Sequence, residues 1–173
     1  PLGESIDTIL YAGNQTPLYY LLLRMLPGDG IGFVRASAVG FGMLNVLLMS
    51  EIVVRFYHNR TLGLALAALL AVNPMHIVLS RTARFYTLLM AVAMIAIVCF
   101  MLLVRGRRSN SLWAAFWVSS GFLYLLHYTG LALPALQLVL MLLNVRQYRD
   151  VLRRWIPGQI AVVLPLLVWY GVL

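Results

Sequence analysis

An uncharged apolar run from Phe85 to Val104, bounded by Arg84 and Arg105, is the feature that most constrains this chain. A helix of about 20 apolar residues spans the hydrocarbon core of a bilayer. The whole chain is 62% hydrophobic and 10% charged, whereas a soluble domain is about 45–50% apolar and about 25% charged. A domain of this size cannot bury so much apolar surface in one core, and a disordered chain is poor in apolar residues. The sequence therefore predicts a polytopic membrane protein.

Further apolar stretches are long enough, or nearly so, to cross a bilayer. We expect six crossings in all, at residues 33–56, 62–79, 85–104, 112–126, 128–145 and 156–173. The short alternating segments of a β-barrel are missing, so the predicted fold class is all-α, a transmembrane helix bundle. Pro74, Pro134 and Pro165 lie inside these runs and predict local kinks.

The N-terminal stretch differs from the rest of the chain. Residues 17–26 are apolar but too short to cross, and we expect them to form an interfacial helix on the outer face. Residues 1–32 are then an outer loop that carries this helix, and residues 33–173 form the bundle. We expect the bundle to be incomplete at both ends, because the chain starts at Pro1 and stops inside an apolar run.

The arginines predict the orientation of the bundle, and all 13 basic residues are arginines. Nine of them lie in alternate loops: Arg55, Arg60, Arg105, Arg107, Arg108, Arg146, Arg149, Arg153 and Arg154. Such loops face the cytosol, which accounts for the basic excess without a nucleic-acid partner. On that face we expect Trp113, Trp117 and Trp155 to form an aromatic belt. Glu51 precedes Arg55 by one turn and predicts an i,i+4 ion pair.

The predicted outer face carries the residues that are best suited to bind a ligand. Arg81 and Arg84 are three residues apart, which predicts that they share one helical face at the start of a crossing, with Tyr86 beside them. Two guanidiniums so placed suit a phosphate or pyrophosphate group, although interfacial anchoring is the alternative interpretation. Arg35 lies near the outer end of its own crossing and either serves the same anion or reaches the interface by itself.

Other outer residues are candidates of lower specificity. Glu4 and Asp7 are either general bases for an acceptor hydroxyl or solvated surface carboxylates. His127 and Tyr128 stand at an outer helix junction, where a hydrogen-bonded anchor is the simpler interpretation. No cluster of His, Cys, Asp and Glu has the spacing of metal ligands, and no glycine-rich phosphate loop is present. We therefore expect neither a metal nor a cofactor.

Four motifs in order resemble a known superfamily. They read QTPLYYLLL from residue 15, GFVRASA from residue 32, SRTARFYTL from residue 80 and HY from residue 127. Over about residues 1–145 the chain resembles the GT-C superfamily of membrane glycosyltransferases. The similarity is to the dolichyl-phosphate-mannose/protein mannosyltransferase type and to bacterial relatives that use polyprenyl-phosphate sugars.

The resemblance implies a reaction and its partners. The enzyme would transfer a hexosyl or mannosyl-type sugar, with inversion, from a polyprenyl-phosphate donor to an acceptor at the extracytoplasmic face of the cell (inner) membrane. It would need no cofactor, and its partners would be the donor, membrane lipids and other membrane proteins.

The resemblance also implies roles for single residues. Glu4 and Gly3 fall on the Glu and Asp of the family's catalytic pair, so Glu4 or Asp7 would act as the base. The family's Arg, Tyr and His-Tyr positions are matched by Arg84, Tyr86, His127 and Tyr128. Arg81 replaces a common Gln, and Gln15 stands where relatives often have His or Lys.

Two departures from the family pattern favour a second hypothesis. With Gly3 at the Asp position and Gln15 at the basic position, the chain would be a non-catalytic GT-C-like membrane subunit with a structural or interaction role in a larger complex. A transporter is the third alternative, and it is disfavoured because deep polar residues are few.

Overall fold

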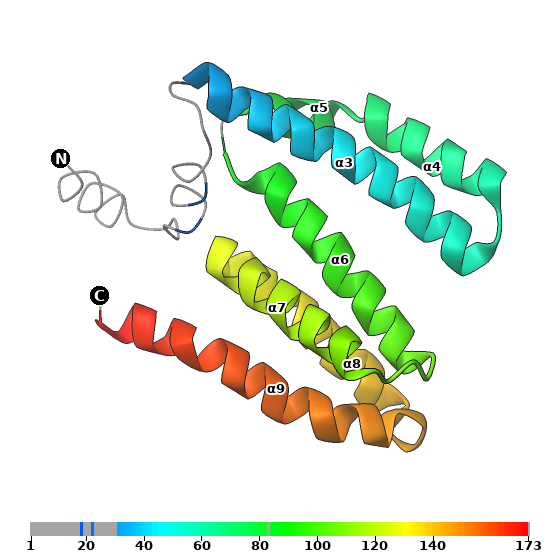
Figure 1. Ribbon diagram of the computed structural model, residues 1–173, viewed down its shortest axis with the longest axis vertical. Coiled ribbons are helices and arrows are strands. Elements are labelled where there is room, and N and C mark those ends of the chain that lie inside the picture. The colour runs from blue at the N-terminus through cyan, green and yellow to red at the C-terminus, as the bar shows by residue number, and fades with distance from the viewer. Residues whose placement is uncertain (1–17, 19–21, 23–30, 83, 173) are drawn as a thin grey trace. The chain divides into compact units, whose positions relative to one another are not determined.

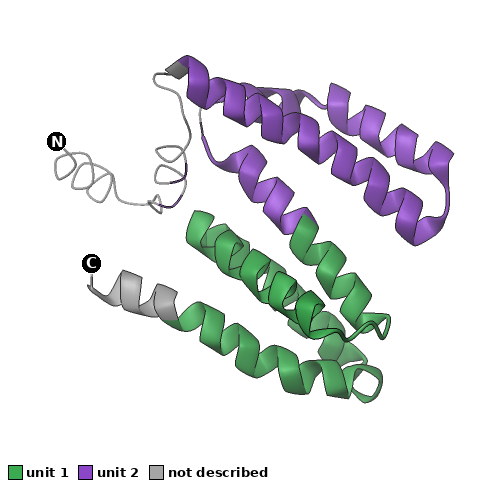
Figure 2. Cartoon of the chain, in the orientation of Figure 1, with its two compact units in different colours: residues 1–16, 95–173 green, residues 17–94 purple. Residues whose placement is uncertain are grey.

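The computed structural model describes Leu18, Leu22, residues 31–82 and residues 84–172, without the side chains of Ile31 and of the residues beyond 164. Every regular element in these ranges is a helix, and no strand occurs among them (Figure 1). The all-α prediction is confirmed for this part of the chain. The described helices belong to two compact units, one within residues 17–94 and one within residues 95–173, coloured separately in Figure 2. The interfacial helix expected at residues 17–26 lies outside the described residues except at Leu18 and Leu22, which are helical.

In the unit of residues 17–94, the long helix α3 (Ile31–Tyr57) packs against α4 (Arg60–Val72) and α5 (Pro74–Arg81). Glycines allow the close approach. A Cβ added to Gly63 would lie 2.9 Å from Val54 Cγ2, and one added to Gly42 would lie 2.9 Å from Ser80 Cβ. Small residues at such crossings let the backbones of membrane helices pack closely. The tight packing therefore aligns α5 along the first half of α3.

The connection between α4 and α5 is set by Asn73 and Pro74. The Asn73 N–H donates to the Leu70 carbonyl and ends α4, while Asn73 Oδ1 accepts a 3.0 Å hydrogen bond from the His76 N–H and begins α5. Pro74 takes the first helical position, where a missing N–H costs nothing. The two helices meet at 61°, which confirms the kink predicted at Pro74.

The second unit contains the end of α6 (Tyr86–Val104), α7 (Asn110–Leu126), the 3₁₀ turn η1 (Tyr128–Leu131), α8 (Ala132–Leu143) and α9 (Val145–Val172). Its core gathers the side chains of Cys99, Phe100, Leu103, Trp113, Phe116, Met141, Val151, Leu152 and Trp155. Trp113 and Trp155 are only 1% and 5% exposed. The expected aromatic belt is therefore wrong for these two side chains, which pack between helices.

Two helices among the described residues are long and apolar enough to cross a membrane, Gly32–Tyr57 and Tyr86–Val104. The bent pair α4–α5 adds a third if it counts as one broken crossing. These helices are typical of a membrane protein, but the six crossings expected from the sequence are not supported. The run 62–79 is broken at Asn73, the run 112–126 lies in a 17-residue helix, and the run 128–145 is divided between η1 and the short α8. The run 156–173 continues a helix whose first turns carry four arginines.

Candidate functional site

A cavity of about 570 Å³ lies beside the ends of α3 and α5 in the unit of residues 17–94. Its lining consists of Arg35 and Val39 from α3, Val78 and Arg81 from α5, and Thr82, which follows α5. Thr82 closes α5 by donating its N–H to the carbonyls of Val78 and Leu79. The cavity thus combines two guanidiniums and one hydroxyl with two apolar side chains.

The described lining of the cavity carries positive charge. It includes no carboxylate, and neither Arg35 nor Arg81 has an ion-pair partner within the described ranges. Guanidinium groups form paired, charge-assisted hydrogen bonds with phosphate and carboxylate oxygens. An anion with two or more oxygens is therefore the ligand that suits this lining.

The packing of α5 on α3 brings Arg35 and Arg81 together, although they are far apart in the sequence. Of the two interpretations offered for Arg35, a shared anion fits this placement better than an isolated interfacial side chain. At its other end α3 carries Arg55, which pairs with Glu51 one turn earlier, as the spacing predicted. The cavity and the Arg55–Glu51 pair therefore lie at opposite ends of the same helix.

Arg81 and Arg84 do not share a helical face, so that expectation is wrong. Arg81 is the last residue of α5, whereas Arg84 lies in the turn before α6, where its N–H donates a 2.8 Å hydrogen bond to the Thr82 carbonyl. Arg84 is exposed and is not among the lining residues of the cavity. Tyr86 begins α6 and packs its ring against Phe85, with the ring centroids 4.6 Å apart.

His127 and Tyr128 form a local pair in the other unit, between α7 and η1. Their ring centroids are 4.3 Å apart. His127 Nδ1 accepts a 3.2 Å hydrogen bond from the Thr129 N–H and lies 2.8 Å from Thr129 Oγ1. Burial lowers the pKa of the His127 imidazole from its usual 6.5, and the neutral ring suits a nitrogen that accepts a backbone N–H. This geometry matches the hydrogen-bonded anchor among the sequence interpretations.

The remaining candidates, Glu4, Asp7 and Gln15, lie outside the described residues. Within those residues, no group of three His, Cys, Asp or Glu side chains is arranged to hold a metal ion.

Thr82, Val39 and Val78 line the cavity but were not predicted from the sequence. Asn45 likewise joins two helices without having been predicted to do so: its amide donates a 2.9 Å hydrogen bond to the Thr87 carbonyl of α6. A lone Asn within a long apolar run was the available signal, because polar groups in a membrane segment need a partner. Residues such as Thr82 give no comparable signal, since they acquire their place only through the α3–α5 packing.

Comparison with known proteins adds no assignment: no protein-family model, no curated protein and no solved structure matches this chain.

Proposed function

We propose that this chain is an integral membrane glycosyltransferase of GT-C type, in which Arg35 and Arg81 hold the phosphate of a polyprenyl-phosphate sugar. The observation that supports the proposal is the cavity of about 570 Å³ that two helices line with these two guanidiniums. A lipid phosphate suits both the charged and the apolar residues that line the cavity. Its oxygens accept from both arginines, and its lipid can continue along the apolar Val39 and Val78.

The length of α3 supports a membrane-surface position for the cavity. Arg35 and Arg55 are separated by 20 residues of one helix, which corresponds to about 30 Å at 1.5 Å per residue. That distance equals the thickness of the hydrocarbon core, about 30 Å. With the Arg55 end at the cytosolic surface, the cavity lies at the extracytoplasmic surface, where the donor would be used.

The proposal includes a topology for the rest of the chain. The bent pair α4–α5 returns across the bilayer as one broken crossing, and six crossings require that α7, η1–α8 and the second half of α9 each cross as well. Single cysteines placed at Arg60 and Thr82, in a variant that lacks Cys99, test the first part of this topology. A membrane-impermeant thiol reagent should modify the cysteine at Thr82 from outside intact cells and the one at Arg60 only after lysis. The opposite pattern would reverse the orientation.

The chemistry follows from the position of the phosphate. The acceptor hydroxyl attacks the anomeric carbon, its proton passes to a carboxylate, and the bond from that carbon to the phosphate oxygen breaks. Negative charge accumulates on the departing lipid phosphate, where Arg35 and Arg81 stabilise it. In this proposal Glu4 or Asp7 supplies the carboxylate, as the GT-C resemblance implies. The same resemblance implies that Arg84, Tyr86 and Gln15 contact the donor, and it matches His127 and Tyr128 to the family's His-Tyr pair.

The test measures sugar transfer from a polyprenyl-phosphate sugar in proteoliposomes, and it compares the wild-type full chain with single variants. Arg35→Ala and Arg81→Ala should each lower transfer by at least about tenfold, the effect of one lost charge-assisted hydrogen bond. Arg60→Ala removes the same charge from the opposite end of the helix pair and serves as the control. Transfer that is unchanged in both cavity variants would refute the phosphate assignment.

The non-catalytic subunit remains the second candidate, because Gly3 stands where the family has Asp. Donor binding and transfer separate the two functions. If the chain is an enzyme, the wild-type protein should transfer sugar, and Glu4→Gln or Asp7→Asn should abolish the transfer. A chain that binds the donor through Arg35 and Arg81 without transferring its sugar would instead be the subunit.

A further inference from the structure

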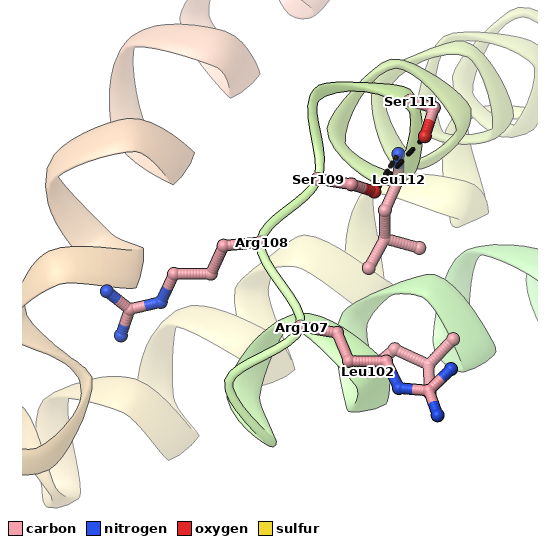
Figure 3. Close-up of a pocket in the computed structure, with 6 residues that line it drawn as sticks. All are labelled: Leu102, Arg107, Arg108, Ser109, Ser111 and Leu112. Carbon is pink, nitrogen blue, oxygen red and sulfur yellow. Dashed lines mark hydrogen bonds between the residues drawn. The ribbon is translucent and has the colours of Figure 1, made fainter.

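A second cavity, of about 540 Å³, lies at the corner between α6 and α7 and has no part in the proposed sugar transfer. Its lining consists of Leu102, Arg107, Arg108, Ser109, Ser111 and Leu112, which Figure 3 shows. Its described lining therefore includes two guanidiniums, two hydroxyls and two leucine side chains, and no carboxylate. This combination suits an anionic group that carries an apolar tail.

The corner owes its shape to Gly106, which ends α6. Gly106 has a φ of 91°, a conformation that L side chains rarely adopt. Its N–H donates to the Leu103 carbonyl at 3.1 Å, and the Arg107 N–H donates to the Leu102 carbonyl at 3.0 Å. This pair of hydrogen bonds is a Schellman motif. It fixes where the Arg107 backbone leaves the helix.

Two contacts to α9 hold the same corner. Arg108 Nη1 pairs with Asp150 Oδ2 at 3.2 Å, and Arg154 Nη2 donates a 2.8 Å hydrogen bond to Asn110 Oδ1. Exposed ion pairs contribute little stability by themselves. Together, however, the two contacts connect the loop that carries the lining residues, and the start of α7, to α9.

The two arginines of the cavity are not equivalent. In Figure 3 the Arg108 side chain extends toward α9, where Asp150 neutralises it, while the Arg107 side chain lies on the other side of the loop beside Leu102. Arg107 has no acidic partner within the described part of the chain. Ser109 Oγ accepts from the Leu112 N–H at 3.2 Å and lies 3.1 Å from Ser111 Oγ. Arg107 is therefore the guanidinium whose charge remains to be balanced.

We propose that this cavity binds the phosphate group of an anionic membrane lipid, with Arg107 as its main charged contact. α6 is one of the two helices that are long and apolar enough to cross, so the corner that follows it lies at headgroup depth. The guanidinium and the Ser111 hydroxyl donate to the phosphate oxygens, and Leu102 and Leu112 contact the start of the acyl chains. The inference does not depend on sugar transfer and would stand if the glycosyltransferase proposal failed.

Lipid retention by the full chain, measured by native mass spectrometry from neutral detergent, tests the charged contact. The probes are phosphatidylglycerol, which is anionic, and phosphatidylcholine, whose net charge is zero. Arg107→Gln should weaken phosphatidylglycerol binding by about tenfold and leave phosphatidylcholine unchanged. Arg60→Gln, which removes an equal charge from another loop of the same predicted face, should retain wild-type binding. Equal losses in the two variants would mean general charge attraction and would overturn the proposal.

A second variant separates the cavity from its charge. Ser111→Leu keeps both arginines but fills the space and removes a hydroxyl at an exposed position of the first turn of α7, where the chain should still fold. It should lower phosphatidylglycerol binding by a factor similar to that of Arg107→Gln, whereas unchanged binding would overturn the site. A last measurement adds inorganic phosphate as a competitor of the bound lipid. Failure to displace the lipid supports a lipid site, and displacement at equal concentration would assign the cavity to a soluble phosphate instead.

Discussion

Asn45 in the middle of α3 donates a 2.9 Å hydrogen bond from its side-chain amide to the backbone carbonyl of Thr87 in the first turn of α6. Asn45 is fully buried and Thr87 is 2% exposed. A polar group in a membrane helix is retained when it is partnered inside the bundle, and here the partner belongs to another helix. The contact joins the helix that carries Arg35 to the segment that follows Arg81.

Asn45→Asp should destabilise the fold strongly, although the two side chains have nearly the same size. The carboxylate cannot donate to the Thr87 carbonyl, and a charge at the centre of a membrane helix costs about 2.5–3.5 kcal/mol. Thermal unfolding in detergent should show the loss as a lowered midpoint. Asn144→Asp makes the same change at an exposed site and should leave the midpoint nearly unchanged. Equal midpoints for both variants would contradict the role of the Asn45 hydrogen bond.

Replacing Gly158 in α9 by alanine should change the stability of the protein through packing alone. A Cβ added there would contact the indole of Trp117, with Cζ2 only 2.8 Å away and two other ring atoms closer. The rigid ring would have to move, and such overpacking typically costs about 1–3 kcal/mol. Gly158→Ala should therefore lower the unfolding midpoint and change the tryptophan emission.

Gly40→Ala is the matched control, because the same methyl group in α3 meets nothing within 4 Å. Replacing a helical glycine by alanine in open space stabilises a helix by about 0.5–1 kcal/mol. The two variants should consequently shift the midpoint in opposite directions. A shift of the same sign in both would show that the contact with Trp117 does not limit the packing of α7 and α9.

The sequence predicted well those features that depend on local patterns. The expected crossings at 33–56 and 85–104 agree closely with α3 and α6. The run 85–104 is bounded by Arg84 and Arg105, and neither run contains a proline. The break at Asn73–Pro74 was also predictable, since a proline removes a backbone hydrogen bond inside a helix but is well tolerated at the first helical position. The run 112–126 also falls within α7, whereas the run 128–145 is divided between η1 and α8, a break that its apolar pattern did not indicate.

The residues of the candidate site were harder to predict from the sequence, because tertiary packing determines which side chains meet there. The three-residue spacing suggested that Arg81 and Arg84 form a pair, but α5 ends at Arg81 and the helix periodicity does not continue to Arg84. The partner of Arg81 is instead Arg35, which the close contact of Gly42 with Ser80 places beside the end of α5. Likewise, Trp113 and Trp155 are of the residue type that forms interfacial belts, but their side chains are buried between helices.

Tyr124 and Gln159 should behave as a coupled pair that joins α7 to α9. The Tyr124 hydroxyl donates to Gln159 Oε1 at 2.5 Å, and both side chains are buried. Tyr124→Phe leaves Gln159 without this partner and should cost about 1 kcal/mol. The double variant with Gln159→Leu removes both polar groups and should be less destabilised than the sum of the single variants. Denaturant unfolding of all four proteins measures the coupling, and strictly additive effects would contradict it.

The stability of the chain should decrease in mild acid because of His127. The folded state holds the pKa of this imidazole below its usual 6.5, mainly through burial. As the pH falls below about 6.5, the unfolded chain takes up the proton first, so the stability present above that pH is lost progressively toward the lowered pKa. His127→Asn keeps an acceptor for the Thr129 N–H but does not titrate. Between about pH 7.5 and pH 5.5, the unfolding midpoint should therefore fall further in the wild-type protein than in His127→Asn. Parallel decreases in the two proteins would show that other groups govern the acid sensitivity.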